Sequence, residues 1–190
     1  MTSPLLFLFA TVILLLTPGP TNTLLWASGA VVGVRRSLPL LMGELLGYLS
    51  AILLILIIFE PIIEQFPLFQ PLLAVILGLY IIYLAISMWR RADHISATSE
   101  LITFKKIFLV TFLNPKAFVF ALTLIPIGHN QMHWYFVALA ASITFIGLSW
   151  VVFGYLVGSV AGQHNLKLFN RFSSVMLTGF AGFIVISAWQ

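Results

Sequence analysis

The chain has 190 residues, of which 61% are hydrophobic and 7% are charged, whereas roughly a quarter of the residues in an ordinary soluble domain are charged. With a mean hydropathy of +1.11, this composition excludes a soluble enzyme and a globular domain with a single anchor, and it predicts a protein of the lipid bilayer. The absence of cysteine excludes a disulfide framework and a thiolate metal site, and the net charge of +4 rests on bases too few and too scattered for a nucleic-acid surface.

Long apolar runs follow one another along the chain and predict helices that cross the membrane. A helix needs about 20 residues to span the hydrocarbon core, and we count six such runs. They are apolar on all sides and do not alternate, which excludes an outer-membrane barrel. The connections are too short to hold a second domain, so we predict one transmembrane domain over residues 1–190. The predicted spans are 5–26, 38–59, 68–89, 107–127, 134–156 and 168–188.

The first predicted span contains a helix break. Residues 17–23 have the sequence TPGPTNT, and proline inside a helix removes a backbone donor and clashes with the preceding turn. Freed backbone groups are tolerated at membrane depth only where they are buried in protein or line a wet cavity, so the break predicts an internal polar site. We do not interpret this span as a signal peptide, because residues 1–4 carry no basic region and no small-residue cleavage site follows.

The second predicted span carries a charge. Glu44 follows Arg36 by eight residues, about 12 Å along a helix, which places it near the middle of a hydrocarbon core about 30 Å thick. A charge at that depth costs about 2.5–3.5 kcal/mol on insertion scales, so Glu44 is a functional candidate by default.

Glycines at small-xxx-small spacing mark the second and fifth spans. Gly43 and Gly47 form one such pair, and Gly154 and Gly158 form another. Small residues at this spacing let helices approach closely. We favour packing within one bundle over a dimer face as their use.

The basic residues predict the orientation in the membrane. Eight of the nine lie in or beside the connections 33–36, 90–106 and 162–167. The positive-inside rule therefore places these three connections in the cytoplasm and both chain termini outside. The ninth base, Lys116, falls inside the fourth span.

The fourth predicted span contains a second break. Asn114 fits a helix N-cap, and Pro115 fits the first turn of a new half-helix. Pro115 follows Lys106 by nine residues, about 14 Å along a helix, so this break lies at a depth similar to that of Glu44. Lys116 is then the second ionisable residue inside a span, and it is a functional candidate for the same reason.

The two breaks are separated by about half of the chain. This spacing predicts two repeats, residues 1–90 and 107–190, joined by the loop 90–106. Each repeat holds three spans, an odd number, so the second repeat inserts upside down relative to the first. The predicted fold is therefore an all-α integral membrane protein with six transmembrane helices in a 3+3 inverted repeat, with broken first and fourth helices, the plan of secondary transporters.

The polar groups at the breaks fit an amino acid. Half-helix N-termini offer free N–H groups and partial positive charge to a carboxylate, Lys116 would draw the same carboxylate, and Glu44 would bind an ammonium group or a coupling proton. The alternatives are that the polar side chains only cap the broken helices, that the two charges form a structural ion pair, or that Lys116 snorkels to the surface. The candidate substrate-binding residues are Pro18, Gly19, Pro20, Thr21, Asn22, Thr23, Asn114, Pro115 and Lys116.

Signals for other chemistry are weak or missing. His129 and His133 are four residues apart, but without a third ligand we do not expect a metal site. No phosphate-binding glycine loop, HExxH pair or nucleophile elbow occurs in the sequence. We therefore expect no enzyme activity and no cofactor.

The chain resembles the LysE family of bacterial amino-acid exporters, which includes the homoserine and threonine efflux proteins, over nearly its whole length. Residues 17–23 are similar to the family's T-P-G-P-x-N motif, and residues 114–117 to its N-P-K-A motif. Residues 77–84 are similar to its third-span G-x-x-Y-L-x-x-L pattern, with the glycine displaced by one position. Glu44 departs from the pattern, whose slot there is usually uncharged, so the resemblance implies that Glu44 tunes substrate choice and is not the family's general coupling residue.

The resemblance implies an inner-membrane exporter that moves amino acids outward, works as a homodimer and is driven by proton antiport. One candidate carboxylate argues against a dibasic substrate, so we favour neutral amino acids. Two alternatives stay open. A small-ion or metal exporter of related fold is disfavoured by the shortage of intramembrane carboxylates, and a non-transporting scaffold would leave two broken helices without a purpose. The resemblance carries over to Pro18, Gly19, Pro20, Asn22, Asn114, Pro115 and Lys116.

Overall fold

The computed structural model describes residues 3–66, 68–91, 102–125 and 132–158, and eight single positions between 171 and 186. All regular secondary structure in these residues is helical, with no strand among them, as the composition predicts. The sixth predicted span, 168–188, lies largely outside the described residues.

The first predicted span is a helix in two pieces. Helix α1 covers Pro4–Leu16, with Ser3 as its N-cap, and helix α2 begins at Pro20 and covers Pro20–Gln65. Residues 17–19 between them are not helical, because Pro18 cannot supply the backbone donor that would continue the ladder. The break that the proline run predicts is therefore present.

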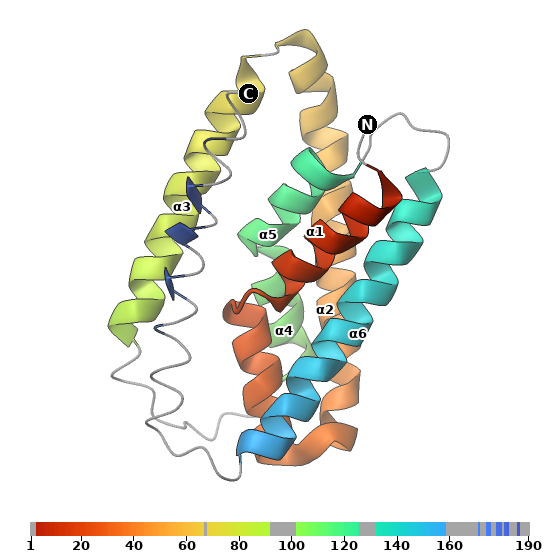
Figure 1. The fold of residues 1–190 in the computed structure, drawn as a ribbon, viewed down its shortest axis with the longest axis vertical. Helices are drawn as coiled ribbons and strands as arrows, with labels where there is room; N and C mark the ends of the chain where they lie inside the picture. Colours follow the sequence, from red (N-terminus) through yellow and green to blue (C-terminus); the bar gives the residue numbers. More distant parts are fainter. Residues whose placement is uncertain are drawn as a thin grey trace.

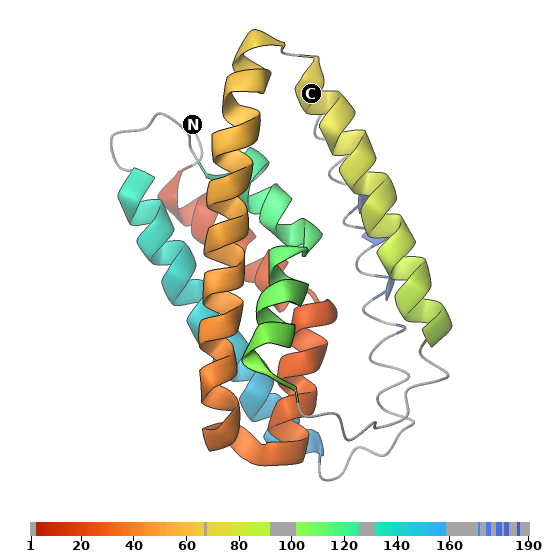
Figure 2. The same cartoon turned by 180° about the vertical axis from the view of Figure 1, so that it is seen from behind.

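Helix α2 is two helices joined at a single residue. Gly33 has φ 79° and ψ 172°, a backbone conformation that is essentially restricted to glycine. The chain reverses there, and the segment after Gly33 runs back alongside the segment before it (Figures 1 and 2). The Ser28 and Ser37 hydroxyls join the two segments by a hydrogen bond of 2.7 Å. The predicted connection 33–36 is thus one residue long, because Arg35 already lies in the second segment.

The remaining helices follow the predicted order with shifted ends. Helix α3 covers Phe69–Arg91, α4 covers Phe104–Phe112, α5 covers Pro115–Val119, and α6 covers Met132–Gly158. A π-helix, η1, covers Phe120–Leu124 and continues from α5. The fourth predicted span is therefore α4, α5 and η1, broken between α4 and α5 as expected.

The structure extends helices into residues that the sequence assigns to connections. The Thr103 side chain accepts a hydrogen bond from the Lys106 N–H at 3.2 Å and starts α4 inside the expected 90–106 loop. Arg90 and Arg91 end α3, where cations favour the C-terminal end of a helix dipole. Helix α6 begins at Met132, two residues before the start of the fifth predicted span, 134–156, so His133 lies in its first turn.

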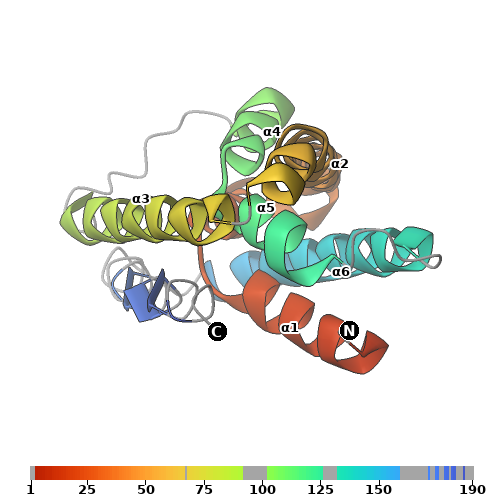
Figure 3. The ribbon, with the colours of Figure 1, turned by 90° about the horizontal axis from the view of Figure 1, so that it is seen from above.

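The helices form one bundle with α3 at its side. Helix α2 packs most extensively on α6 and then on α4, and α5 contacts both α2 and α3 (Figure 3). The broken helix formed by α1 and the start of α2 runs in the opposite direction to the broken helix formed by α4 and α5 (Figures 1 and 2). The two breaks therefore come from antiparallel helices.

The distribution of side chains is that of a membrane protein. Large apolar side chains cover the outside, for example Leu5, which is 80% exposed, whereas Glu44 and Lys116 are buried. Residues 20–59 form a long apolar stretch that reverses at Gly33, and residues 132–157 form a helix long and apolar enough to cross a membrane. Helix α1 and residues 71–87 are shorter apolar helices. The count of six spans stays a prediction.

Glycines allow α2 and α6 to pack closely against each other. A Cβ on Gly29 would collide with the Val151 carbonyl oxygen of α6, and a Cβ on Gly154 would collide with the Trp26 carbonyl oxygen of α2. Each helix thus offers a glycine to the backbone of the other. Contact of this kind brings helix axes close together.

The predicted glycine pair in the second span faces a different helix. A Cβ on Gly43 would lie 3.0 Å from the Phe104 carbonyl oxygen, and a Cβ on Gly47 would lie 2.8 Å from Thr111 Cβ. Both positions therefore pack on α4 within the bundle. Gly158, the partner that we assign to Gly154 by spacing, is the last residue of α6.

Replacing Gly33 tests the one-residue turn. Gly33→Ala places a Cβ in a strained backbone conformation, and we expect a loss of about 1–3 kcal/mol in stability. The measurement is thermal unfolding of the purified protein in detergent. Gly182→Ala is the matched control, because a Cβ there meets nothing within 4 Å and should change stability by less than about 0.5 kcal/mol. Equal melting temperatures for the two variants would contradict the turn.

Candidate functional site

The two helix breaks meet inside the bundle. The Lys116 ammonium, just after the second break, donates a hydrogen bond to the carbonyl oxygen of Thr17 at the first break. A Cβ placed on Gly19 would lie 3.4 Å from Lys116 Nζ, so Gly19 also lies against the ammonium. Lys116 is 2% exposed, which argues against the alternative in which it snorkels to the surface.

Asn114 ties the second break to two other helices. Its Oδ1 accepts a hydrogen bond from the Lys116 N–H at 3.1 Å, which is the predicted N-cap. Its Nδ2 donates to Thr21 Oγ1 at 3.2 Å and to Tyr48 Oη at 3.3 Å. The hydroxyls of Thr21 and Thr111 are also 3.1 Å apart. One buried amide therefore connects α5 with both segments of α2.

Side chains that follow the first break satisfy its freed backbone. Asn22 Nδ2 donates to the Leu15 carbonyl at 2.8 Å and to the Thr17 carbonyl at 3.0 Å. Thr23 Oγ1 donates to the Gly19 carbonyl at 2.9 Å. Asn22 and Thr23 thus act as caps of the break in this structure, which was the alternative to substrate binding.

The N-terminus of α2 differs from that of α5. Gly19 is its N-cap and provides no side-chain hydrogen bond, whereas Asn114 caps α5. The first N–H groups of a helix have no intrahelical partner. Pro20 has no N–H, so Thr21 and Asn22 carry the N–H groups of the first turn of α2 that lack an intrahelical partner, and this turn begins beside the Lys116 ammonium.

Glu44 lies in the same interior with an unsatisfied oxygen. It is 1% exposed, and its Oε2 has no hydrogen-bond partner among the described residues. A Cβ on Gly147 of α6 would collide with Oε2, and Leu41 lies beside it. Glu44 lies one helical turn before Tyr48, which accepts a hydrogen bond from Asn114, whereas the hydrogen bond of the Lys116 ammonium goes to Thr17.

Sequence analysis missed three residues of this cluster. Tyr48 lies one helical turn after Glu44, Thr111 lies one turn before Asn114, and Gly147 is in a span for which only other glycines were singled out. Residues three or four apart share a helix face, so a search for polar neighbours at that spacing would have found Tyr48 and Thr111. Only the fold brings Gly147 to Glu44.

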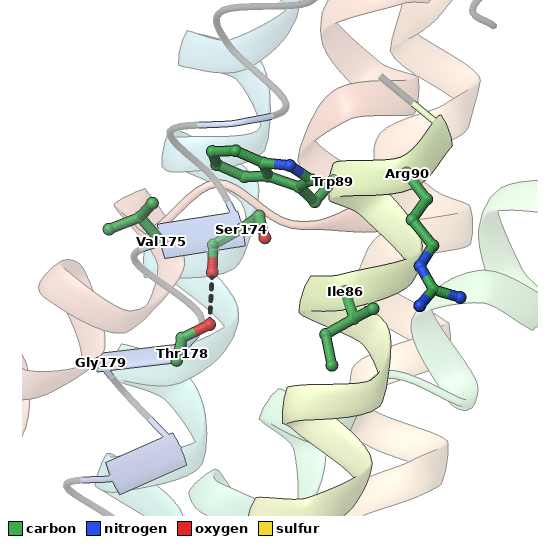
Figure 4. Close-up of a pocket in the computed structure, with 7 residues that line it drawn as sticks. All are labelled: Ile86, Trp89, Arg90, Ser174, Val175, Thr178 and Gly179. Carbon is green, nitrogen blue, oxygen red and sulfur yellow. Dashed lines mark hydrogen bonds between the residues drawn. The ribbon is translucent and has the colours of Figure 1, made fainter. Parts of the chain in front are cut away.

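A wide cleft lies elsewhere in the molecule. It has a volume of about 510 Å³ and opens between the end of α3 and the described positions after residue 171 (Figure 4). The Arg171 guanidinium stacks over the Trp89 ring at 5.2 Å near this cleft. None of the predicted site residues lines this cleft. The candidate site therefore remains the buried polar residues at the two helix breaks. The cleft is lined by Ile86, Trp89, Arg90, Ser174, Val175, Thr178 and Gly179.

The histidine pair is not part of the cluster. His133 is exposed in α6, and His129 lies outside the described residues. Among the residues that the structure describes, no three His, Asp or Glu side chains gather as a metal site would require.

Fold and site together define a multi-pass membrane protein with a polar centre where two broken helices meet. The sequence matches the model of the LysE type translocator family over residues 12–188, and the chain belongs to that family. Proteins of this family are translocators and not enzymes. The chain is also 29% identical over 160 residues to an uncharacterized membrane protein of Vibrio cholerae serotype O1, an alignment that covers 80% of this chain and 78% of that protein. No solved structure matches.

Removing the Asn114 amide should destabilise the protein. Asn114→Ala deletes a helix cap and leaves the Thr21 and Tyr48 hydroxyls without their shared donor, for which we expect a loss of about 2–4 kcal/mol. Thermal unfolding in detergent measures it. Tyr48→Phe is the comparison, because it removes one acceptor while Asn114 keeps Thr21, and we expect less than about 1.5 kcal/mol. If Tyr48→Phe lowers the stability as much as Asn114→Ala does, the Asn114 amide is not the group that links α5 to both segments of α2.

Proposed function

We propose that this chain is a secondary active transporter of the bacterial inner membrane that exports amino acids, neutral ones in the first place, or close derivatives, by proton antiport. The observation that carries the proposal is the buried pair of opposite charges, Glu44 and Lys116, beside the two breaks. A zwitterionic amino acid carries a carboxylate, which can pair with Lys116, and an ammonium, which can pair with Glu44. Membership of a translocator family supports transport as the activity.

The substrate carboxylate is assigned to the first turn of α2. That turn has no side-chain cap at Gly19, and the Lys116 ammonium lies against Gly19. A carboxylate there gains both backbone donors and a cation. This assignment uses Gly19, Pro20, Thr21 and Lys116 of the predicted site.

The substrate ammonium is assigned to Glu44. The Oε2 atom lacks a donor within the described residues, and an unpaired carboxylate at this depth is costly. A bound ammonium supplies the missing donor. With one carboxylate for one ammonium, the site suits a neutral amino acid better than a dibasic one.

We assign the antiport to the same carboxylate, as a property of this chain and not of the whole family. The Lys116 ammonium bonds to Thr17, and Oε2 of Glu44 has no donor among the described residues, which is costly for a buried oxygen. On the outward step the substrate ammonium supplies this donor while the substrate carboxylate pairs with Lys116, and on the return step a proton binds the oxygen. One oxygen that must always hold one of two cations couples export of substrate to entry of a proton.

The membrane arrangement is part of the proposal. Six spans in a 3+3 inverted repeat would place the breaks at the repeat interface, as in other transporters with interrupted helices, and the antiparallel course of the two broken helices supports this. The turn at Gly33 and the start of α4 lie at one end of the bundle, and their bases favour the cytoplasmic side for that end.

Counterflow in proteoliposomes tests the function. We expect vesicles loaded with a neutral amino acid to accumulate the labelled compound, and a panel of neutral, acidic and dibasic amino acids to rank neutral ones first. Vesicles without protein are the control. Absence of exchange with every amino acid in the panel would favour the ion-exporter or scaffold alternatives.

Removing the Glu44 charge tests the coupling. Glu44→Gln cannot carry a proton between the two sides, so we expect efflux driven by an inward proton gradient to be lost, while counterflow survives with a KM raised about 10- to 100-fold through the weaker bond to the substrate ammonium. Glu44→Asp keeps the carboxylate and should keep the gradient dependence. Efflux by Glu44→Gln that still responds to the proton gradient would remove Glu44 from the coupling role.

A further inference from the structure

The carbonyl end of α1 leads into the protein interior. The last four carbonyl groups of a helix have no intrahelical partner, and that end carries a partial negative charge. The C-cap, Thr17, is buried, so protein groups provide the donors to its carbonyl. Asn22 reaches the Leu15 and Thr17 carbonyls, but an amide supplies no positive charge.

The positive charge at this end comes from Lys116. Its ammonium donates to the Thr17 carbonyl, lies against Gly19 and is fully enclosed by protein. Glu44 is buried in the same interior, on the second segment of α2. The Thr17 carbonyl oxygen, the break and a buried carboxylate together make the surroundings that a monovalent cation prefers.

Transporters with broken helices place a coupling cation in such surroundings, because unwound carbonyls and half-helix C-terminal ends coordinate it. In this chain the Lys116 ammonium lies at the corresponding position, beside the Thr17 carbonyl at the end of α1. We propose that the Lys116 ammonium is a tethered cation that occupies the cation site of the α1 break, so that the protein binds no alkali-metal ion there, and removal of the side chain opens a site for a small monovalent cation. The consequence for transport rests on the proposed function, whereas the binding site does not.

The side chain has a simple chemical equivalent. Lys116→Ala keeps Cβ and removes three carbons and the ammonium, which together have the size of propylammonium. n-Propanol has nearly the same shape without the charge. Lys116→Met keeps much of the volume and loses the charge, so it leaves no space for a free cation. These reagents separate the charge of Lys116 from its packing.

Thermal unfolding of purified protein tests the site without any substrate. We expect Lys116→Ala to unfold at a lower temperature than the wild type, and propylammonium to raise its melting temperature with a saturable concentration dependence. We expect n-propanol to give no such rise, and wild type and Lys116→Met to show none with either compound. Equal effects of the two compounds on Lys116→Ala, or a rise of the same size in wild type, would overturn the tethered cation.

Transport adds a second, separate readout. We expect Lys116→Ala to lower counterflow about 10- to 100-fold, the loss typical of one charge-assisted hydrogen bond, and propylammonium to restore it. Lys105→Ala, which removes an exposed lysine of α4, is the control and should transport normally. If wild type exchanges no amino acid, the proposed function fails, while the unfolding measurement still decides the cation site.

Wild type alone provides a test that does not depend on a folded variant. We expect equal exchange rates in sodium, potassium and N-methylglucamine media, because the cation of the break is part of the chain. A rate that requires sodium or potassium would show that a free ion occupies the break and would overturn the proposal.

Discussion

Backbone groups that leave a helix at membrane depth must find partners inside the protein, and this constraint organises the whole structure. The prolines that interrupt the first and fourth predicted spans free backbone groups from the helix ladder. Groups from each break then bond to groups at the other break. The Thr17 carbonyl accepts from Lys116, while Asn114 caps its own half-helix and reaches Thr21. The glycines of α2 and α6 let the helices approach closely enough for this to happen.

Local chemistry made the breaks and most of the described helices predictable, because proline and long apolar runs have the same effect wherever they occur in a chain. The third and fifth predicted spans correspond to α3 and α6. The connection 33–36 was predicted at the right place, but the structure turns at Gly33 alone. The composition of a loop cannot show that a single glycine reverses the chain. The contacts of Glu44 with Gly147 and of Asn114 with Tyr48 join distant parts of the sequence, so only the packed helices reveal them.

The two buried charges have different surroundings and hence different chemistry. Lys116 donates to a backbone carbonyl oxygen, an acceptor that is part of the main chain and is present whatever side chains surround it. Glu44 keeps one oxygen without a donor in the described part of the chain, which suits a group whose partner changes. The fixed contact of Lys116 and the donor-free oxygen of Glu44 therefore suit the two ends of the proposed substrate.

The short hairpin around Gly33 also determines how the two buried charges reach the same interior. One residue connects the two segments of α2, and the Ser28 and Ser37 hydroxyls bridge them. The segment that starts from the N-cap Gly19, against Lys116, and the segment that carries Glu44 are therefore consecutive stretches of chain with a single turn between them. A substitution that opened this turn would move the groups at the first break away from the carboxylate without changing either of them.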